Sequence, residues 1–217
     1  MDIFGPPELQ EILEIQFKYS QTELRYPIYF HPTHTQKSEL IFQNNDIVVE
    51  TIILEHRIPC TGFKFTQKRR LRKIIREKVE TLGIPVEMIP LIKRGTDFTD
   101  KEGNVHLASD LTTEPDEPRS YAYCSDTICN WEYLETIRGV NTIYHESTFM
   151  NDMLDRARET FHTTALQAAE VAVSAGAEQL LLGHFSARYR ELEPLLLEAQ
   201  SVFPNSKLAI EGHSFVI

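Results

Sequence analysis

The chain has 217 residues, of which 41% are hydrophobic, and this suits one domain with a real core or one domain with an appendage. Its net charge of −10 excludes a protein that coats nucleic acid over its whole surface, although it leaves room for a local basic patch. No apolar run approaches a membrane span, MDIFGPPELQ lacks a signal-peptide pattern and the three cysteines form no CxxC pair, so we expect a cytoplasmic protein with reduced thiols.

The N-terminal part of the chain predicts one helix and several short strands. GPPELQEILEIQF, which starts at Gly5, is typical of a helix opened by proline. Strands are expected over 27–30, 39–42 and 47–54, and the last of these is rich in β-branched residues. This strong strand runs directly into Glu55-His56.

The next stretch, KFTQKRRLRKIIREKVETL over residues 64–82, is densely basic. Leu71, Ile74, Ile75 and Val79 fall on one stripe, so the segment is predicted to be helical. Residues 97–107, around Glu-Gly-Asn, are expected to form a turn-rich excursion.

From residue 119 onward, strands alternate with helices. The predicted strands are 121–124, 142–145, 179–182 and 207–210, and the predicted helices lie near 131–137, up to about 159, and over 163–174 and 191–202. This alternation indicates a layered α/β fold, in which functional residues lie just past strand ends.

Three side chains occupy such positions: His56 after TIILE, Asp126 after YAYCS, and His184 after QLLLG. Imidazole and carboxylate groups are the usual nitrogen and oxygen ligands of zinc and similar divalent ions. The alternatives are that each histidine is structural and that Asp126 only caps the helix near residue 131. His31 and His34 are interpreted as surface residues of a loop.

Several motifs, taken in order, resemble ribonuclease Z, the endonuclease that matures tRNA 3′ ends. They are "IFGPPEL", "LEHRIPCTGF", "YCSDT", "HESTF", "FHTTALQAA", "GHFSARY" and "EAQSVFPNSKLAIEG". The resemblance covers essentially the whole chain and implies the αββα sandwich of the metallo-β-lactamase superfamily, which is an α/β fold. It also implies two-metal hydrolysis with two zinc ions in a complete site, or manganese as the alternative.

The resemblance also implies residue roles. His56 would ligate one metal, His184 the other, and Asp126 would bridge the two. His162 would act as the general acid for the leaving group, with Glu146 as its orienting partner. Arg188 would support the same cluster.

The family's main metal motif, H-x-H-x-D-H, has no match in these residues. The chain therefore resembles the C-terminal portion of a ribonuclease Z, with the N-terminal part of the fold missing. Three ligands would hold metal poorly, and an uncovered sheet would expose apolar surface. We expect the 217 residues alone to be inactive and prone to aggregate.

Residues 64–95 lie where the family inserts its tRNA-binding arm. The residues predicted to contact nucleic acid are Lys68, Arg69, Arg70, Arg72, Lys73, Lys93 and Arg94. The expected partners are precursor tRNA and a second copy of the chain in a homodimer. Two rival readings stay open, namely another phosphodiesterase of the superfamily and an inactive tRNA-binding or partner module.

Overall fold

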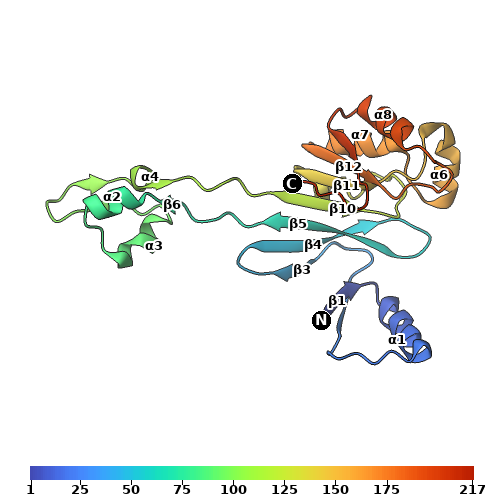
Figure 1. Cartoon of the computed structure of the whole chain (residues 1–217), viewed down its shortest axis with the longest axis horizontal. Helices are drawn as coiled ribbons and strands as arrows, with labels where there is room; N and C mark the ends of the chain where they lie inside the picture. The colour runs from blue at the N-terminus through green and yellow to red at the C-terminus, as the bar shows by residue number, and fades with distance from the viewer. The chain divides into compact units, whose positions relative to one another are not determined.

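The computed structural model describes residues 1–217, which form two compact units (Figure 1). The larger unit contains Met1–Thr66 and Arg119–Ile217, and the smaller unit contains Gln67–Pro118. None of the helices in either unit combines the length and the apolar character that a membrane span requires.

A seven-stranded sheet organises the larger unit, in the order β13-β12-β11-β10-β5-β4-β3. The strands are β3 (Leu40–Gln43), β4 (Ile47–Leu54), β5 (Cys60–Gln67), β10 (Ser120–Cys124), β11 (Thr142–Glu146), β12 (Gln179–Gly183) and β13 (Ser206–Leu208). Strands β10 to β13 are parallel to one another, whereas β5 runs antiparallel to β10, and β3 to β4. The carboxyl ends of the parallel strands therefore meet at one edge of the sheet.

Helical crossovers connect the parallel strands, as parallel pairing requires. They are α5 (Leu134–Ile137), the 3₁₀-helix η2 (Asn151–Met153), α6 (Leu154–Thr160), α7 (Ala165–Ala175) and α8 (Glu193–Gln200). Helices α7 and α8 lie over β11 and β12 (Figure 1). Helix α7 buries four alanines between Ala165 and Ala172, whose small side chains let the helix pack closely against Ile143, Leu180 and Leu182.

The N-terminal segment forms a second, two-stranded sheet. Strand β1 (Asp2–Gly5) pairs in parallel with β2 (Tyr29–Pro32), and α1 (Glu8–Ser20) connects them. Strand β1 is absent from the sequence prediction because four residues at a chain terminus carry little periodicity. His31 and His34 have side chains that are 44% and 73% exposed, so their interpretation as surface residues is confirmed, although His31 lies in β2 and not in a loop.

The smaller unit has a hydrophobic core of its own. Its elements are β6 (Lys73–Ile74), α2 (Arg76–Thr81), the 3₁₀-helix η1 (Val86–Met88), α3 (Ile89–Ile92), β7 (Phe98–Thr99), β8 (Val105–His106), α4 (Ala108–Leu111) and β9 (Thr112–Thr113). The core consists of Ile84, Ile92, Phe98, Ala108 and Leu111. The turn-rich excursion predicted over 97–107 is the β7–β8 hairpin.

The helix predicted over 64–82 is wrong for most of its length. Residues up to Gln67 belong to β5, whose antiparallel pairing with β10 overrides the helical stripe. Only Arg76–Thr81 is helical, and Leu71 is 47% exposed instead of facing a core. The other predicted helices and strands exist, with boundaries shifted by a few residues.

Candidate active site

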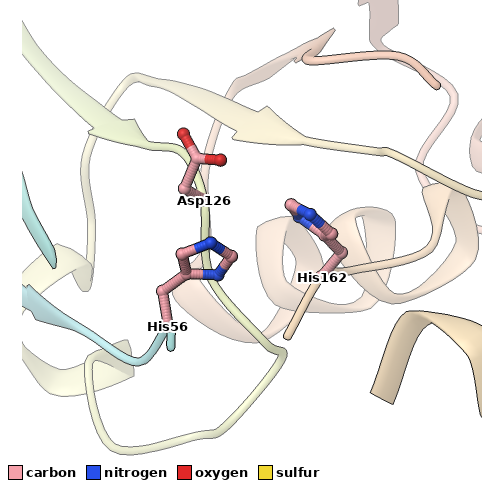
Figure 2. Close-up of side chains that lie close together, drawn as sticks. All are labelled: His56, Asp126 and His162. Atoms are coloured by element: carbon pink, nitrogen blue, oxygen red, sulfur yellow. The ribbon is translucent and has the colours of Figure 1, made fainter. Parts of the chain in front are cut away.

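Three strands of the main sheet deliver the predicted ligands. His56 lies two residues after β4, Asp126 two residues after β10, and His184 directly after β12. Figure 2 shows the side chains of His56, Asp126 and His162 around a common space, and one donor atom from each lies within 4.8 Å of the others. Glu146, His162 and His184 form an overlapping group by the same measure. The structure therefore brings together all five predicted ligands and catalytic residues.

Backbone strain is concentrated at this site. Asp126, Phe161 and His184 have φ values of 56°, 59° and 54°, in the left-handed region. The only other non-glycine residue with positive φ is Gln21, at the end of α1. Each such conformation costs an ordinary residue about 1 kcal/mol, and surrounding structure must hold it in place. Two of the three strained residues are predicted ligands, and the third precedes His162.

Glu146, at the end of β11, is fully buried and accepts four hydrogen-bond donors. They are Thr127 N–H at 2.6 Å, Thr148 Oγ1–H at 2.6 Å, Thr163 N–H at 3.0 Å and His162 Nδ1–H at 3.0 Å. Burial by itself raises the pKa of this carboxyl, but the bonds from His162, Thr148 and Thr163 outweigh burial and leave the pKa below its usual value. Glu146 is therefore a buried carboxylate anion.

His162 follows α6 and precedes the capping box of α7, in which Thr164 and Gln167 bond each other's backbone N–H groups. The hydrogen bond to Glu146 raises the pKa of His162 above its ordinary value of 6.5, against the opposing effect of burial. Because a carboxylate only accepts, Nδ1 carries a proton, and Nε2 is the second ring nitrogen that can exchange one.

The imidazole of His184 is oriented by Thr148, which sequence reasoning missed. The Thr148 hydroxyl donates its hydrogen to Glu146, so its oxygen accepts the 2.8 Å hydrogen bond from His184 Nδ1–H. His184 Nε2 therefore has a lone pair available and lies 3.1 Å from Asp126 Oδ1. The signal for Thr148 was its place two residues past Glu146, in the loop that follows β11.

The donor set fits a divalent metal ion. His56 Nδ1 bonds the Phe161 carbonyl oxygen at 3.0 Å, which leaves Nε2 of His56 as the ligand atom. A metal-ligating histidine commonly donates its other N–H to an oxygen in this way, as His184 also does. Asp126 and His184 have side chains that are 43% and 37% exposed, so a substrate can approach them.

Asp126 does not cap the helix near residue 131, so that alternative is wrong. Helix α5 begins at Leu134, and the cap position is occupied by Tyr133. The Asp126 carboxylate instead lies 3.1 Å from His184 Nε2 and accepts a hydrogen bond from Ser125 Oγ at 3.5 Å.

Arg188 contacts the cluster only through the ring of Phe149. Its guanidinium stacks over Phe149 at 5.1 Å, and the Phe149 ring meets His162 edge-on at 6.2 Å. Its Nε donates to Ser186 Oγ at 3.3 Å. Arg188 therefore packs against Phe149, which in turn packs against His162, and it forms no hydrogen bond with the other site residues.

The predicted nucleic-acid residues lie in the smaller unit, Gln67–Pro118. Arg69 and Arg72 bond Glu114, Lys73 bonds Asp116, and Lys68 also has an interaction partner. An open hollow is lined by Arg69, Arg70, Arg72, Lys93 and Arg94 together with Glu114.

Comparison with solved structures identifies the fold. The short form of human tRNase Z superposes with a TM-score of 0.57 at 22% identity, over 96% of this chain and 64% of that chain. A metallo-β-lactamase fold protein from Bacillus subtilis superposes with a TM-score of 0.59 at 14% identity, over 98% of this chain and 63% of that chain. The predicted α/β fold of the metallo-β-lactamase type is confirmed. The chain thus spans less than two thirds of the length of both solved structures.

No protein-family model matches the chain. A ribonuclease Z from Cytophaga hutchinsonii is 45% identical over 216 residues, which are 99% of this chain and 69% of that protein. A ribonuclease Z from Bacteroides fragilis is 44% identical over 212 residues, which are 98% of this chain and 70% of that protein. Nearly the whole chain thus matches such relatives, and the chain belongs to the ribonuclease Z family.

Proposed function

We propose that the chain forms part of a metal-dependent endoribonuclease that removes the 3′ trailer of precursor tRNA. The observation that carries this proposal is the His162–Glu146 pair, placed against the His56, Asp126 and His184 ligand set. Membership of the ribonuclease Z family supports the substrate class. The product would be a tRNA that ends at its discriminator base.

The metal proposed is zinc, two ions per complete site, with manganese as the alternative. His56 Nε2, His184 Nε2 and the Asp126 carboxylate would hold the ions. Divalent ions bound there would activate water for attack on phosphorus and neutralise charge on the phosphate oxygens.

His162 is proposed as the proton donor to the departing oxygen. Its raised pKa keeps a larger fraction of the imidazole protonated near neutral pH than an ordinary histidine would have. Glu146 fixes Nδ1–H and stabilises the imidazolium, so that Nε2–H is the proton that leaves. The buried donors around Glu146 keep that carboxylate charged and oriented.

Catalysis also needs the ligands of the H-x-H-x-D-H motif, which these 217 residues do not contain. We therefore propose that the bare chain binds zinc weakly and does not cleave precursor tRNA. Native mass spectrometry of the purified protein would report its mass, its metal content and whether it is the proposed homodimer. Two tightly bound zinc ions on a 217-residue protomer would contradict this part of the proposal.

The catalytic roles can be tested in a chimera that adds the portion of the Cytophaga hutchinsonii relative outside the 69% matched here. We expect the chimera to release the trailer from a precursor tRNA transcript, and the bare chain to release none. His162→Ala in the chimera should slow cleavage by about 10²–10⁴-fold, the range of general acid catalysis. His34→Ala, at an exposed histidine, is the matched control. Cleavage by the His162→Ala chimera at the control rate would refute the assignment.

The basic residues of the smaller unit are proposed to bind the tRNA backbone. Replacing Arg69, Arg70 and Arg72 together with alanine should weaken tRNA binding and flatten its salt dependence. Hydrolysis of a small chromogenic phosphodiester by the chimera should change little. Unchanged tRNA affinity would favour a phosphodiesterase of small substrates.

A second candidate is an inactive tRNA-binding module, which the cationic lining of the hollow in the smaller unit favours. A chimera that binds precursor tRNA without cutting it would support this candidate.

A further inference from the structure

Two segments of the smaller unit run side by side with opposite charge. Strand β6 pairs antiparallel with β9, with Lys73 opposite Thr113 and Ile74 opposite Thr112. Residues 68–73, which lead into β6, read KRRLRK, and the residues from Thr113 onward read TEPDEP. Pro115 and Pro118 have no N–H group, so they cannot extend the ladder of backbone hydrogen bonds.

Side-chain ion pairs connect these two segments instead. Arg72 donates to Glu114, and Arg69 lies 3.5 Å from the other oxygen of Glu114. Arg69 also lies 3.7 Å from Glu117, and Lys73 bonds Asp116 at 3.2 Å. Two of the arginines proposed to bind tRNA, Arg69 and Arg72, are therefore already paired with carboxylates of the same chain.

Of these carboxylates, only Glu114 lines the hollow that contains Arg69, Arg72 and the other cationic side chains. The hollow contains five cationic side chains, and three of them, Arg70, Lys93 and Arg94, form no side-chain ion pair or hydrogen bond. A carboxylate bound to guanidinium groups has the same geometry as a phosphate oxygen pair bound to them. Glu114 therefore occupies the position that a phosphate would take.

The two sides of this contact differ in how firmly they are held. Arg72 is 22% exposed, and its Nε donates to Thr112 Oγ1 at 2.5 Å, so its guanidinium is fixed without Glu114. Glu114 is 59% exposed, and its carboxylate is held only by Arg69 and Arg72. An exposed ion pair of this kind is weak, so a polyanion can displace the carboxylate while the arginine stays in place.

We propose that Glu114 is an internal competitor of RNA phosphate, which occupies Arg69 and Arg72 until a phosphate of the precursor tRNA displaces it. The inference rests on the proposed binding of tRNA by these arginines. Displacement lowers affinity for any single phosphate and favours ligands that present several phosphates to the hollow at once.

The test compares Glu114→Gln with Glu87→Gln in the full chain. Glu87 lies on η1 of the same unit, is exposed and forms no ion pair, so this control removes the same charge. Binding of a fluorescent precursor tRNA transcript with a 3′ trailer is measured over a series of NaCl concentrations. We expect Glu114→Gln to bind about two- to fivefold tighter than Glu87→Gln, the equivalent of one exposed ion pair. Its plot of log affinity against log salt should steepen by up to about one.

The triple variant, in which alanine replaces Arg69, Arg70 and Arg72, distinguishes failure of the competitor proposal from failure of the tRNA-binding proposal. The gain from Glu114→Gln should disappear in the triple-variant background, because the competitor acts through those arginines. If the triple variant weakens binding but Glu114→Gln binds no tighter than Glu87→Gln, the competitor is refuted and tRNA binding by the arginines stands. Weaker binding by Glu114→Gln would show that the ion pairs only hold the two segments together, which also overturns the proposal. If the triple variant binds tRNA as wild type does, the proposed binding function fails, and the competitor fails with it.

Discussion

Replacement of Glu146 by glutamine tests the central polar network of the site. The amide has one acceptor oxygen and one NH₂ group, whereas the carboxylate receives donors at both oxygens. If the NH₂ group takes the place of Oε1, it meets Thr127 N–H, which now lies 2.6 Å from that oxygen. If it takes the place of Oε2, it meets Thr163 N–H, which lies at 3.0 Å. Neither orientation satisfies all the donors.

The expected loss follows from these contacts. One buried N–H without an acceptor costs about 1–3 kcal/mol, and the charge-assisted bond to His162 contributes about 1.5–3 kcal/mol. Thr148 reduces the loss, because its hydroxyl can turn to the His184 carbonyl oxygen at 3.0 Å. The free energy of unfolding should therefore fall by about 2–4 kcal/mol, which for a chain of this size lowers Tm by roughly 5–15 °C.

Thermal unfolding followed by circular dichroism in the presence of a chelator measures this loss without a contribution from metal. Glu170→Gln is the matched control, because Glu170 is exposed on α7 and the substitution removes the same charge. A Glu146→Gln variant that melts within about 2 °C of that control would refute the network as a source of stability.

Four further outcomes are expected. Gly183→Ala should lower the free energy of unfolding by about 1–3 kcal/mol, because a Cβ at residue 183, which precedes His184, collides with the Tyr144 ring. Urea titration measures this loss. In the chimera, His184→Ala should bind less zinc than His34→Ala in equilibrium dialysis, and equal zinc content would contradict the ligand assignment. The pKa of His162, followed by NMR, should fall in Glu146→Gln because Glu146 is the main cause that raises it. Because the pKa of His162 is higher in the folded state than in the unfolded state, protonated His162 contributes fully to the free energy of unfolding below pH 6.5. This contribution is lost as the pH rises through the folded pKa. In a His162→Ala variant, the free energy of unfolding should lack this dependence on pH.

The sequence predicted the sheet edge well because strand ends are local features. His56, Asp126 and His184 each follow a β-rich run, and parallel strands place their carboxyl ends at one edge. The family resemblance supplied the catalytic roles of His162 and Glu146, which pattern alone did not assign. Which histidine nitrogen faces the site was not predictable, because it depends on Thr148 and on the Phe161 carbonyl, which come from different loops.

The basic segment failed as a helix prediction for a physical reason. Its apolar stripe is genuine, since Ile74 and Val79 pack on the core of the smaller unit. Pairing across long sequence separations decides the outcome, with Thr66 opposite Ser120 in one sheet and Ile74 opposite Thr112 in another. Single-sequence periodicity contains no information on such partners. The acidic residues opposite the arginines, including Glu114, were missed for the same reason.

The hydrogen bonds to Glu146 make assembly of the site a cooperative event. Its donors come from the loop after β10, the loop after β11 and the segment between α6 and α7. A local opening of any one loop leaves a buried anion short of donors, which penalises partly assembled states and favours the complete one. The Thr127 and Thr163 amides should therefore exchange with solvent deuterium at similar rates, although 36 positions separate them in the sequence. A polar site built this way opens and closes as one unit, so its side chains are either all in place or all released.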